Sequence, residues 1–194
     1  MLVLDTSTII NLCATNRAAE IIGALPSKVV IEKTVMEELE VGRLRGRSDA
    51  DTIEQLTATG VIEMVRLGPA GLDHFETLIS GPAIDTLDDG EAATIALAVE
   101  IGAVPVIDER KAHRICREQF PLLQAASTLE LLAHPNAETA LGLSELADAV
   151  FQALISARMR VLTEHMDWVL GLIGPQRASQ CLSLPRKVRD RPIK

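Results

Sequence analysis

Short apolar runs that alternate with stretches of helical spacing constrain the fold of this chain more than any other feature. The runs are rich in β-branched residues and predict strands at residues 2–4, 28–31, 61–67, 104–108 and 122–125. The stretches between them predict helices over 34–41, 49–59, 70–80, 87–100 and 109–118. Strands that alternate with helices in this way form a parallel sheet covered by helices on both faces. The sequence therefore predicts an α/β fold.

The chain is expected to divide into three parts. Residues 1–133 carry the alternating pattern and form the α/β unit, and residues 134–176 are purely helical and form an extension. The apolar positions at helical spacing in this extension predict a packing face, on which we expect a homodimer interface. Residues 177–194 form a basic tail.

Size and cysteine usage favour an ordinary globular protein. A chain of 194 residues is long enough to bury a core without disulfides or metals. The three cysteines are widely separated and have no zinc-site spacing, which favours a reducing compartment. The first residues lack a signal-peptide pattern, and no run of eighteen apolar residues occurs. We therefore expect a cytoplasmic protein with no membrane association.

Net charge and aromatic content argue at first against nucleic acid as a partner. The net charge is −8 and only 2% of the residues are aromatic, whereas modules that stack bases need aromatic platforms. The charge is unevenly spread, however. The tail carries a net charge of +5, which leaves −13 for residues 1–176. Contact with a nucleic-acid backbone therefore stays compatible with this composition, and base stacking does not.

Four carboxylates stand at the ends of strands or on the helices that follow them. Asp5 and Asp108 come directly after predicted strands, and Glu91 lies in the first turn of a buried helix. Glu38 lies on the flank of the apolar face of its helix. Each acid taken singly also fits a structural role, since Asp5, Asp108 and Asp88 are well placed to cap helices. Because ligands bind at the carboxyl ends of parallel strands, we expect the four to converge on one crevice.

Converging carboxylates repel one another unless a cation lies between them. Mg²⁺ is a hard cation that is held by a few carboxylates together with waters and phosphates. Such an ion polarises a phosphoryl oxygen and lowers the pKa of bound water, which is the chemistry of phosphodiester hydrolysis. The four acids therefore indicate a metal-dependent hydrolase.

These residues resemble the PIN-domain ribonucleases, whose toxin members are the VapC type. The resemblance covers about residues 1–130. It implies a three-layer α/β/α sandwich with a central parallel sheet, and Mg²⁺- or Mn²⁺-dependent endoribonuclease activity. Four pieces in order carry it: Val3-Leu4-Asp5-Thr6-Ser7, Val35-Met36-Glu37-Glu38-Leu39, Leu87-Asp88-Asp89-Gly90-Glu91-Ala92 and Val106-Ile107-Asp108-Glu109-Arg110-Lys111.

Carried over by position, the resemblance implies an acidic quartet that binds the metal and performs catalysis: Asp5, Glu38, Glu91 and Asp108. Thr6 or Ser7 would supply a supporting hydroxyl. The Gly90-Glu91-Ala92 form is similar to a branch of the family with glutamate at the third position, where toxins more often have aspartate. Asp88 therefore competes with Glu91 as the third ligand, and Glu37 competes with Glu38 for the second.

Two basic groups flank the acids in sequence. Arg43 opens an arginine-rich loop after the Glu38 helix, and Arg110, Lys111 and Arg114 lie on the helix after Asp108. One interpretation is a solvated basic surface. The other is that these four residues contact RNA phosphates, which requires no aromatic side chain.

Three other functions compete with that of a nuclease toxin with a cognate antitoxin. Haloacid-dehalogenase-type phosphatases need a second aspartate where Ser7 stands, and response-regulator receivers need an acidic pair early in the chain. Both patterns are missing here. The remaining alternative is a PIN-like module that binds a partner and has little or no nuclease activity.

Overall fold

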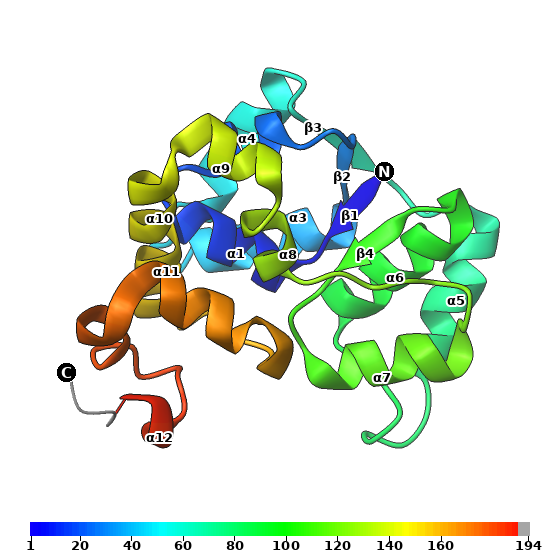
Figure 1. Ribbon diagram of the computed structural model, residues 1–194. Helices are drawn as coiled ribbons and strands as arrows, with labels where there is room; N and C mark the ends of the chain where they lie inside the picture. Colours follow the sequence, from blue (N-terminus) through cyan, green and yellow to red (C-terminus); the bar gives the residue numbers. More distant parts are fainter. Residues whose placement is uncertain (190–194) are drawn as a thin grey trace. The chain divides into compact units, whose positions relative to one another are not determined.

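Four parallel strands form a sheet in the order β3-β2-β1-β4 (Figure 1). They are β1 (Leu2–Leu4), β2 (Val29–Glu32), β3 (Ile62–Val65) and β4 (Val104–Val106) in a computed structural model that describes residues 1–189. The parallel sheet with helices in its connections confirms the predicted α/β/α fold.

Helices occupy every long connection, and each predicted helix is present within a few residues of its expected bounds. The helices are α1 (Thr6–Ala14), α2 (Ala18–Ala24), α3 (Lys33–Arg43), α4 (Asp49–Ala58), α5 (Pro69–Ile79), α6 (Asp89–Ile101), α7 (Arg110–Gln119), α8 (Thr128–Leu132), α9 (Pro135–Leu141), α10 (Leu143–Ser156), a 3₁₀ turn η1 (Thr163–His165), α11 (Met166–Ala178) and α12 (Arg186–Arg189).

Residue contacts divide the chain into two units. The first comprises Met1–Ile9 and Ser27–Ser127 and contains the whole sheet, and the second comprises Ile10–Pro26 and the residues from Thr128 onward. All the acids of the predicted site lie in the first unit. The expected boundaries at residues 133 and 176 stay predictions.

The strand order creates a switch point beside β1. The chain moves from β1 to β2 to β3 in one direction across the sheet, and then returns to place β4 on the other side of β1. In the register of these two strands, Leu4 lies opposite Val106. Asp5 and Asp108 therefore follow neighbouring strands at the same edge. Ligands of open α/β sheets bind at such a point.

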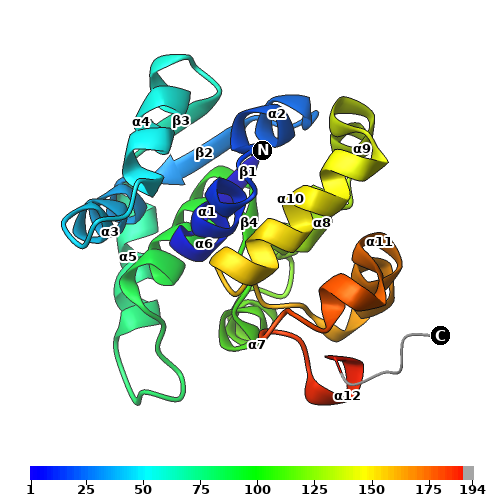
Figure 2. The same cartoon turned by 90° about the vertical axis from the view of Figure 1, so that its left-hand side faces the viewer.

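Helix α6 forms the centre of the core next to this edge. It packs against β1, β2 and β4, and α3 and α5 lie beside it (Figure 2). Its residues from Ala92 to Ala98 are all buried, as the alanine-rich sequence predicts. Small side chains let the helix backbone approach the sheet closely, which holds the first turn of α6 near the ends of the strands.

The strand predicted at residues 122–125 is wrong. The chain forms a turn after Phe120, and only Ala126 makes an isolated parallel bridge, to Val106. Leu122 is 98% exposed and follows Pro121, which has no backbone N–H to donate to a ladder. A strand in the interior of a parallel sheet is buried on both faces, and this segment is not.

The described part of the second unit is helical. Helices α10 and α11 are separated by a segment in which Arg158 has a φ of 55°, and α11 is kinked at Gly174 and Pro175. Part of the expected basic tail belongs to ordered structure, since Arg177 lies in α11 and pairs with Asp148 at 2.5 Å. Tail residues 190–194 lie outside the described residues. Among residues 1–189, no helix is long and apolar enough to cross a membrane.

Candidate active site

Asp5 lies at the carboxyl end of β1, and its carboxylate turns back onto the first turn of α1. Its Oδ1 accepts a hydrogen bond from the Thr8 backbone N–H at 2.7 Å, and its Oδ2 accepts one from Ser7 Oγ at 2.8 Å. Its own backbone N–H donates to the Val106 carbonyl of β4 at 3.2 Å. Asp5 thus caps α1, as the structural alternative expects. At 2% exposure it is also a buried carboxylate at the switch point.

The acids of the site raise one another's pKa. Burial raises the pKa of Asp5 to about 6, and the charge of Asp108 acts in the same direction. Burial also raises the pKa of Glu91 to about 7, and the charges of Asp5, Asp88 and Glu109 raise it further. Asp108 itself is only 6% exposed. Asp5, Glu91 and Asp108 are therefore brought close enough to interact electrostatically in a region of low solvent access.

Glu38 is tied to two other segments of the site. Its Oε1 accepts the backbone N–H of Gly90 at 2.9 Å, and its Oε2 accepts a short hydrogen bond from Thr6 Oγ1. Glu37, in contrast, is 59% exposed at its side chain and pairs with Lys33 at 2.5 Å. This placement supports Glu38 over Glu37 as the acid on α3. The two candidate hydroxyls also separate, because Thr6 serves Glu38 and Ser7 serves Asp5.

Asp88 and Glu91 occupy different positions at the start of α6. Asp88 is the N-cap residue and is exposed, but its side chain accepts no capping hydrogen bond. The carboxylate of Glu91 instead accepts from the Asp88 backbone N–H, which lowers its pKa somewhat against the larger effects of burial and charge. The side-chain cap expected from Asp88 therefore does not form. Glu91, with its interaction with Asp5, is the better placed of the two as a third ligand.

The donor chemistry of these residues fits a hard divalent cation. Asp5 and Glu91 are oxygen donors, and neither forms an ion pair with a lysine or arginine among residues 1–189. In the same residues, no three His, Cys, Asp or Glu side chains stand close enough together to enclose a metal. Mg²⁺ is commonly held by one or two carboxylates and completes its shell with waters and phosphate. The site therefore suits such an ion better than a closed all-protein cage.

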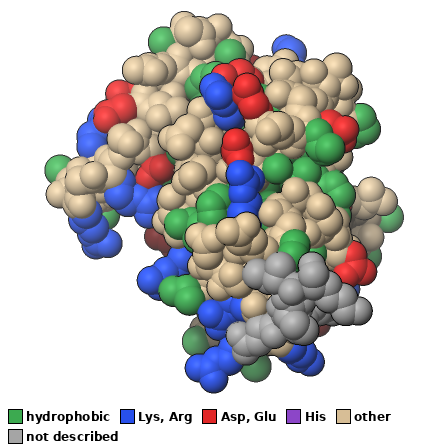
Figure 3. Space-filling model, turned by 60° about the vertical axis from the view of Figure 1, so that its left-hand side comes forward, with side chains coloured by type: hydrophobic (Ala, Val, Ile, Leu, Met, Phe, Trp, Pro, Cys, Tyr) green, Lys and Arg blue, Asp and Glu red, His purple; other side chains and the backbone are tan. Residues whose placement is uncertain are grey.

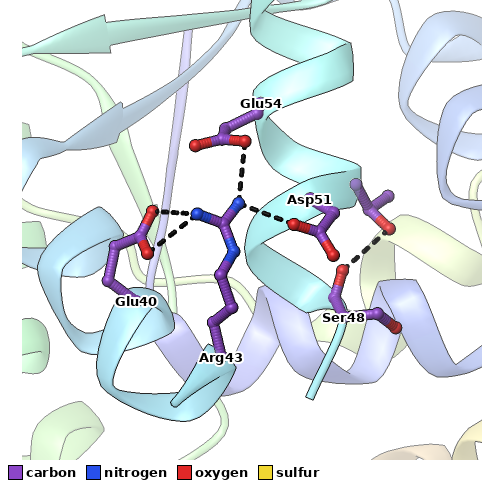
Figure 4. A network of polar contacts seen from close by, with 6 residues as sticks. Glu40, Arg43, Ser48, Asp51 and Glu54 are labelled. Carbon is purple, nitrogen blue, oxygen red and sulfur yellow. Dashed lines mark hydrogen bonds and ion pairs between the residues drawn. The ribbon is translucent and has the colours of Figure 1, made fainter. Parts of the chain in front are cut away.

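Arg43 is surrounded by the acidic side chains of α3 and α4 (Figure 4). Its guanidinium pairs with Glu40 of α3 at 2.8 Å and with Asp51 and Glu54 of α4 at 2.7 Å each. These contacts join α3 to α4. Because three carboxylates already share one guanidinium, the arrangement favours a structural role for Arg43 over the expected contact with phosphate.

Two of the three basic candidates on α7 also have partners within the protein. Lys111 Nζ donates to the Ala83 carbonyl at 2.7 Å, and Arg114 donates to the Ile84 carbonyl at 2.6 Å. Both side chains thus hold the loop that leads into α6. The side chain of Arg110 is exposed and forms no hydrogen bond or ion pair with residues 1–189. On the face drawn in Figure 3, basic side chains are interspersed with other types and do not form one continuous stripe.

Two contacts near the strand ends were not predicted. Thr8 is fully buried, and its Oγ1 donates to the Val106 carbonyl at 2.9 Å. His113 Nε2 lies 2.7 Å from the Ile107 carbonyl, next to Asp108. The run of hydroxyls after Asp5 was the only sequence signal for the first contact, and it is equally typical of a helix start.

The raised pKa values predict how the metal-free protein responds to pH. The folded state binds these protons more tightly than the unfolded state, in which the pKa of Asp5 is near its ordinary value of 3.8. The stability from Asp5 and Glu91 is therefore present below about pH 4 and is lost as the pH rises through about 6 to 7.

Asp5→Asn removes one of the two titrating groups. In EDTA, we expect its melting temperature to fall less than that of the wild type between about pH 4 and pH 8, and to exceed the wild-type value at the upper end. Circular dichroism melts across this range measure the difference. Parallel profiles for the two proteins would show that burial of Asp5 has no such electrostatic cost.

The comparisons with known proteins agree with this geometry. A family model described as DUF3368, a PIN domain, matches residues 1–175. The match thus spans the sheet, the four acids and the helices up to Pro175. No curated protein and no solved structure matches the chain. Because the family model covers most of its length, the chain belongs to the PIN-domain family.

Proposed function

We propose that this protein is a Mg²⁺- or Mn²⁺-dependent endoribonuclease that hydrolyses RNA phosphodiester bonds. PIN domains are generally nucleases, so membership of the family supports a hydrolase of this broad type. The metal, the RNA substrate and the residues involved are parts of the proposal.

One observation carries the proposal. Asp5, Glu91 and Asp108 lie at the switch point between β1 and β4. The charge of Asp108 raises the pKa of Asp5, and the charge of Asp5 raises the pKa of Glu91. A structural cap requires no such group of acids. A protein that kept them only as caps would be more stable with fewer buried charges, since desolvation opposes ionisation of each carboxyl.

In this proposal the four acids and their hydrogen-bond donors have different roles. Asp5 would hold the cation together with Asp108 or Glu91, waters would complete its shell, and Glu38 is the fourth acid of the group, held between Thr6 and Gly90. A bound cation would polarise a phosphoryl oxygen and lower the pKa of a water that attacks phosphorus. Ser7 and the Thr8 backbone N–H donate to the ionised form of Asp5, so they favour the charged state that binds the cation.

RNA contact is expected to follow the backbone of the substrate and not its bases. The scarcity of aromatic side chains disfavours base stacking. Arg110 is exposed at the start of α7, two residues after Asp108, and is available for a phosphate. Lys111 and Arg114 reach phosphate in this proposal only by giving up contacts with the loop before α6.

A toxin role is the narrower form of the proposal. It includes a cognate antitoxin as partner, a cytoplasmic location and a homodimer, and each of these stays a prediction. Expression of the wild type is expected to arrest growth of the host cell, and expression of Asp108→Asn is not, because the variant lacks one acid of the metal site. Growth curves after induction, with equal expression checked by immunoblot, measure this. Equal arrest by both proteins would contradict the toxin role.

Cleavage of RNA tests the central part of the proposal. With Mn²⁺ or Mg²⁺, the purified wild type is expected to cut labelled RNA, and Asp5→Asn to lower the rate by at least about 100-fold, since the metal supplies several kcal/mol of transition-state stabilisation. Asp73→Asn, an exposed aspartate on α5, is the matched control and is expected to retain the wild-type rate.

The controls of this assay also separate the alternatives. EDTA is expected to abolish cleavage. Cleavage that survives EDTA or Asp5→Asn means that the site or the metal is wrongly assigned. A folded wild type that cuts none of several RNAs favours the PIN-like module that binds a partner.

Arg110→Ala tests backbone contact. We expect KM for RNA to rise about three- to tenfold with little change in kcat, because the lost contact is made equally in the ground and transition states. The salt dependence of KM is expected to become shallower. Lys28→Ala is the matched control, since Lys28 is exposed just before β2 at the opposite edge of the sheet. The same change in both variants would point to a general charge effect.

A further inference from the structure

Gly90 is a glycine that the backbone does not require. It is the second residue of α6 and is buried, and it is not among the glycines with positive φ. Glycine is also a poor helix former, because it loses more conformational freedom on folding than alanine does. Some other feature must account for its presence beside the acids of the site.

The carboxylate of Glu38 occupies the space that a side chain at Gly90 would need. A Cβ on Gly90 would lie 2.4 Å from Glu38 Oε2 and 2.9 Å from its Cδ, closer than real Cβ contacts allow. The Gly90 backbone N–H donates to Oε1 of the same carboxylate at 2.9 Å. The acid thus rests directly on the backbone of the first turn of α6.

Thr6 holds the other oxygen of this carboxylate. Its Oγ1 donates to Glu38 Oε2, so a single carboxylate joins the starts of α1 and α6 to α3. Thr6 directly follows Asp5, and Gly90 directly precedes Glu91. Any shift of Glu38 therefore acts on the neighbours of two acids of the site.

We propose that Gly90 is a positioning residue, whose bare Cα seats Glu38 between Thr6 and α6 and thereby sets Glu91 relative to Asp5. The inference rests on the proposed nuclease function. It goes further by assigning a role to the glycine of the Gly90-Glu91-Ala92 sequence, and it identifies Glu38 as the link between the two helix starts.

The structure offers a matched control for this role. At the start of α5, a Cβ on Gly71 would lie 2.4 Å from Glu100 Oε2, and Gly68 N–H donates to that oxygen at 2.9 Å. A carboxylate again rests on glycine backbone, away from the site acids, but here the N–H donor is Gly68, and Leu67 Cδ2 would also lie 2.8 Å from the Cβ on Gly71. A second control is Gly23 in α2, where a Cβ would meet nothing within 4 Å.

The test compares Gly90→Ala with Gly71→Ala and Gly23→Ala. Gly90→Ala is expected to weaken Mn²⁺ binding, measured by calorimetry, and to slow RNA cleavage, each by at least about tenfold. Gly71→Ala crowds the Glu100 carboxylate and Leu67, so it is expected to lower the melting temperature but to keep both properties within about twofold of wild type. Gly23→Ala is expected to leave all three unchanged or to raise stability.

Shortening Glu38 supplies a second, independent measurement. Glu38→Asp withdraws the carboxylate from Gly90, so Gly90→Ala is expected to cost little further Mn²⁺ affinity in that background. In a Glu38→Ala background, where the carboxylate is gone, Gly90→Ala is expected to raise the melting temperature, although it lowers it in the wild type. If Gly90→Ala changed the melting temperature equally with and without Glu38, the proposed contact of the Glu38 carboxylate with Gly90 would be overturned.

The remaining outcomes are equally decisive. Wild-type Mn²⁺ affinity and activity in Gly90→Ala would overturn the positioning role. A wild type that neither binds Mn²⁺ nor cleaves RNA would overturn the proposed function and the positioning role together. The melting-temperature cycle with Glu38→Ala still decides in that case whether Glu38 is seated on Gly90, so the two failures are distinguishable.

Discussion

The parallel pairing of β1 with β4 is the constraint on which the rest of the site depends. Because Leu4 lies opposite Val106, the residues after both strands leave the sheet at the same edge, and Asp5 and Asp108 follow there. The Val106 carbonyl binds both the Asp5 backbone N–H and Thr8 Oγ1, so the start of α1 is fixed to the end of β4. Buried like charges are then unavoidable, and the pKa values of Asp5 and Glu91 rise in consequence.

The acids combine a structural and a chemical role. Asp5 caps α1, and Glu38 links the starts of two helices through Thr6 and Gly90. The same hydrogen bonds hold these carboxylates in fixed orientations, which is what a binding site for a hard cation requires. A cap and a ligand are therefore not exclusive interpretations of one aspartate. On the sequence alone, capping and metal binding are alternatives, and the geometry allows both.

The sheet and its helices could be predicted because their signals are local. The β-branched runs and the alanine-rich stretch of α6 specify elements without reference to the rest of the chain. The strand predicted at residues 122–125 is wrong because an apolar run does not establish burial, and Leu122 is exposed. Helical spacing places Glu38 on the flank of the apolar face of α3, but which of Glu37 and Glu38 faces the site depends on the rotation of α3 against α6.

Partners of long side chains were the least predictable part. Lys111, Arg114 and Arg43 all contact groups more than two residues away in sequence, and those contacts depend on tertiary structure. The hydrogen bond from Gly90 N–H to the Glu38 carboxylate joins residues 52 positions apart, and it likewise could not be predicted from the sequence. The sequence shows which residues carry charge, but only the fold shows which charges are already paired. The side chain of Arg110 stands apart from these networks, and its contact with phosphate stays a prediction.

The proposed function requires a divalent cation between the acids at the switch point. Anomalous diffraction from crystals grown with Mn²⁺ tests this most directly, because it locates the ion without reference to activity. We expect one strong peak within coordination distance of Asp5 and of either Asp108 or Glu91. Waters are expected to complete the coordination shell of the ion. Crystals that bind Mn²⁺ only elsewhere, or that show these carboxylates without an ion at saturating Mn²⁺, would contradict it.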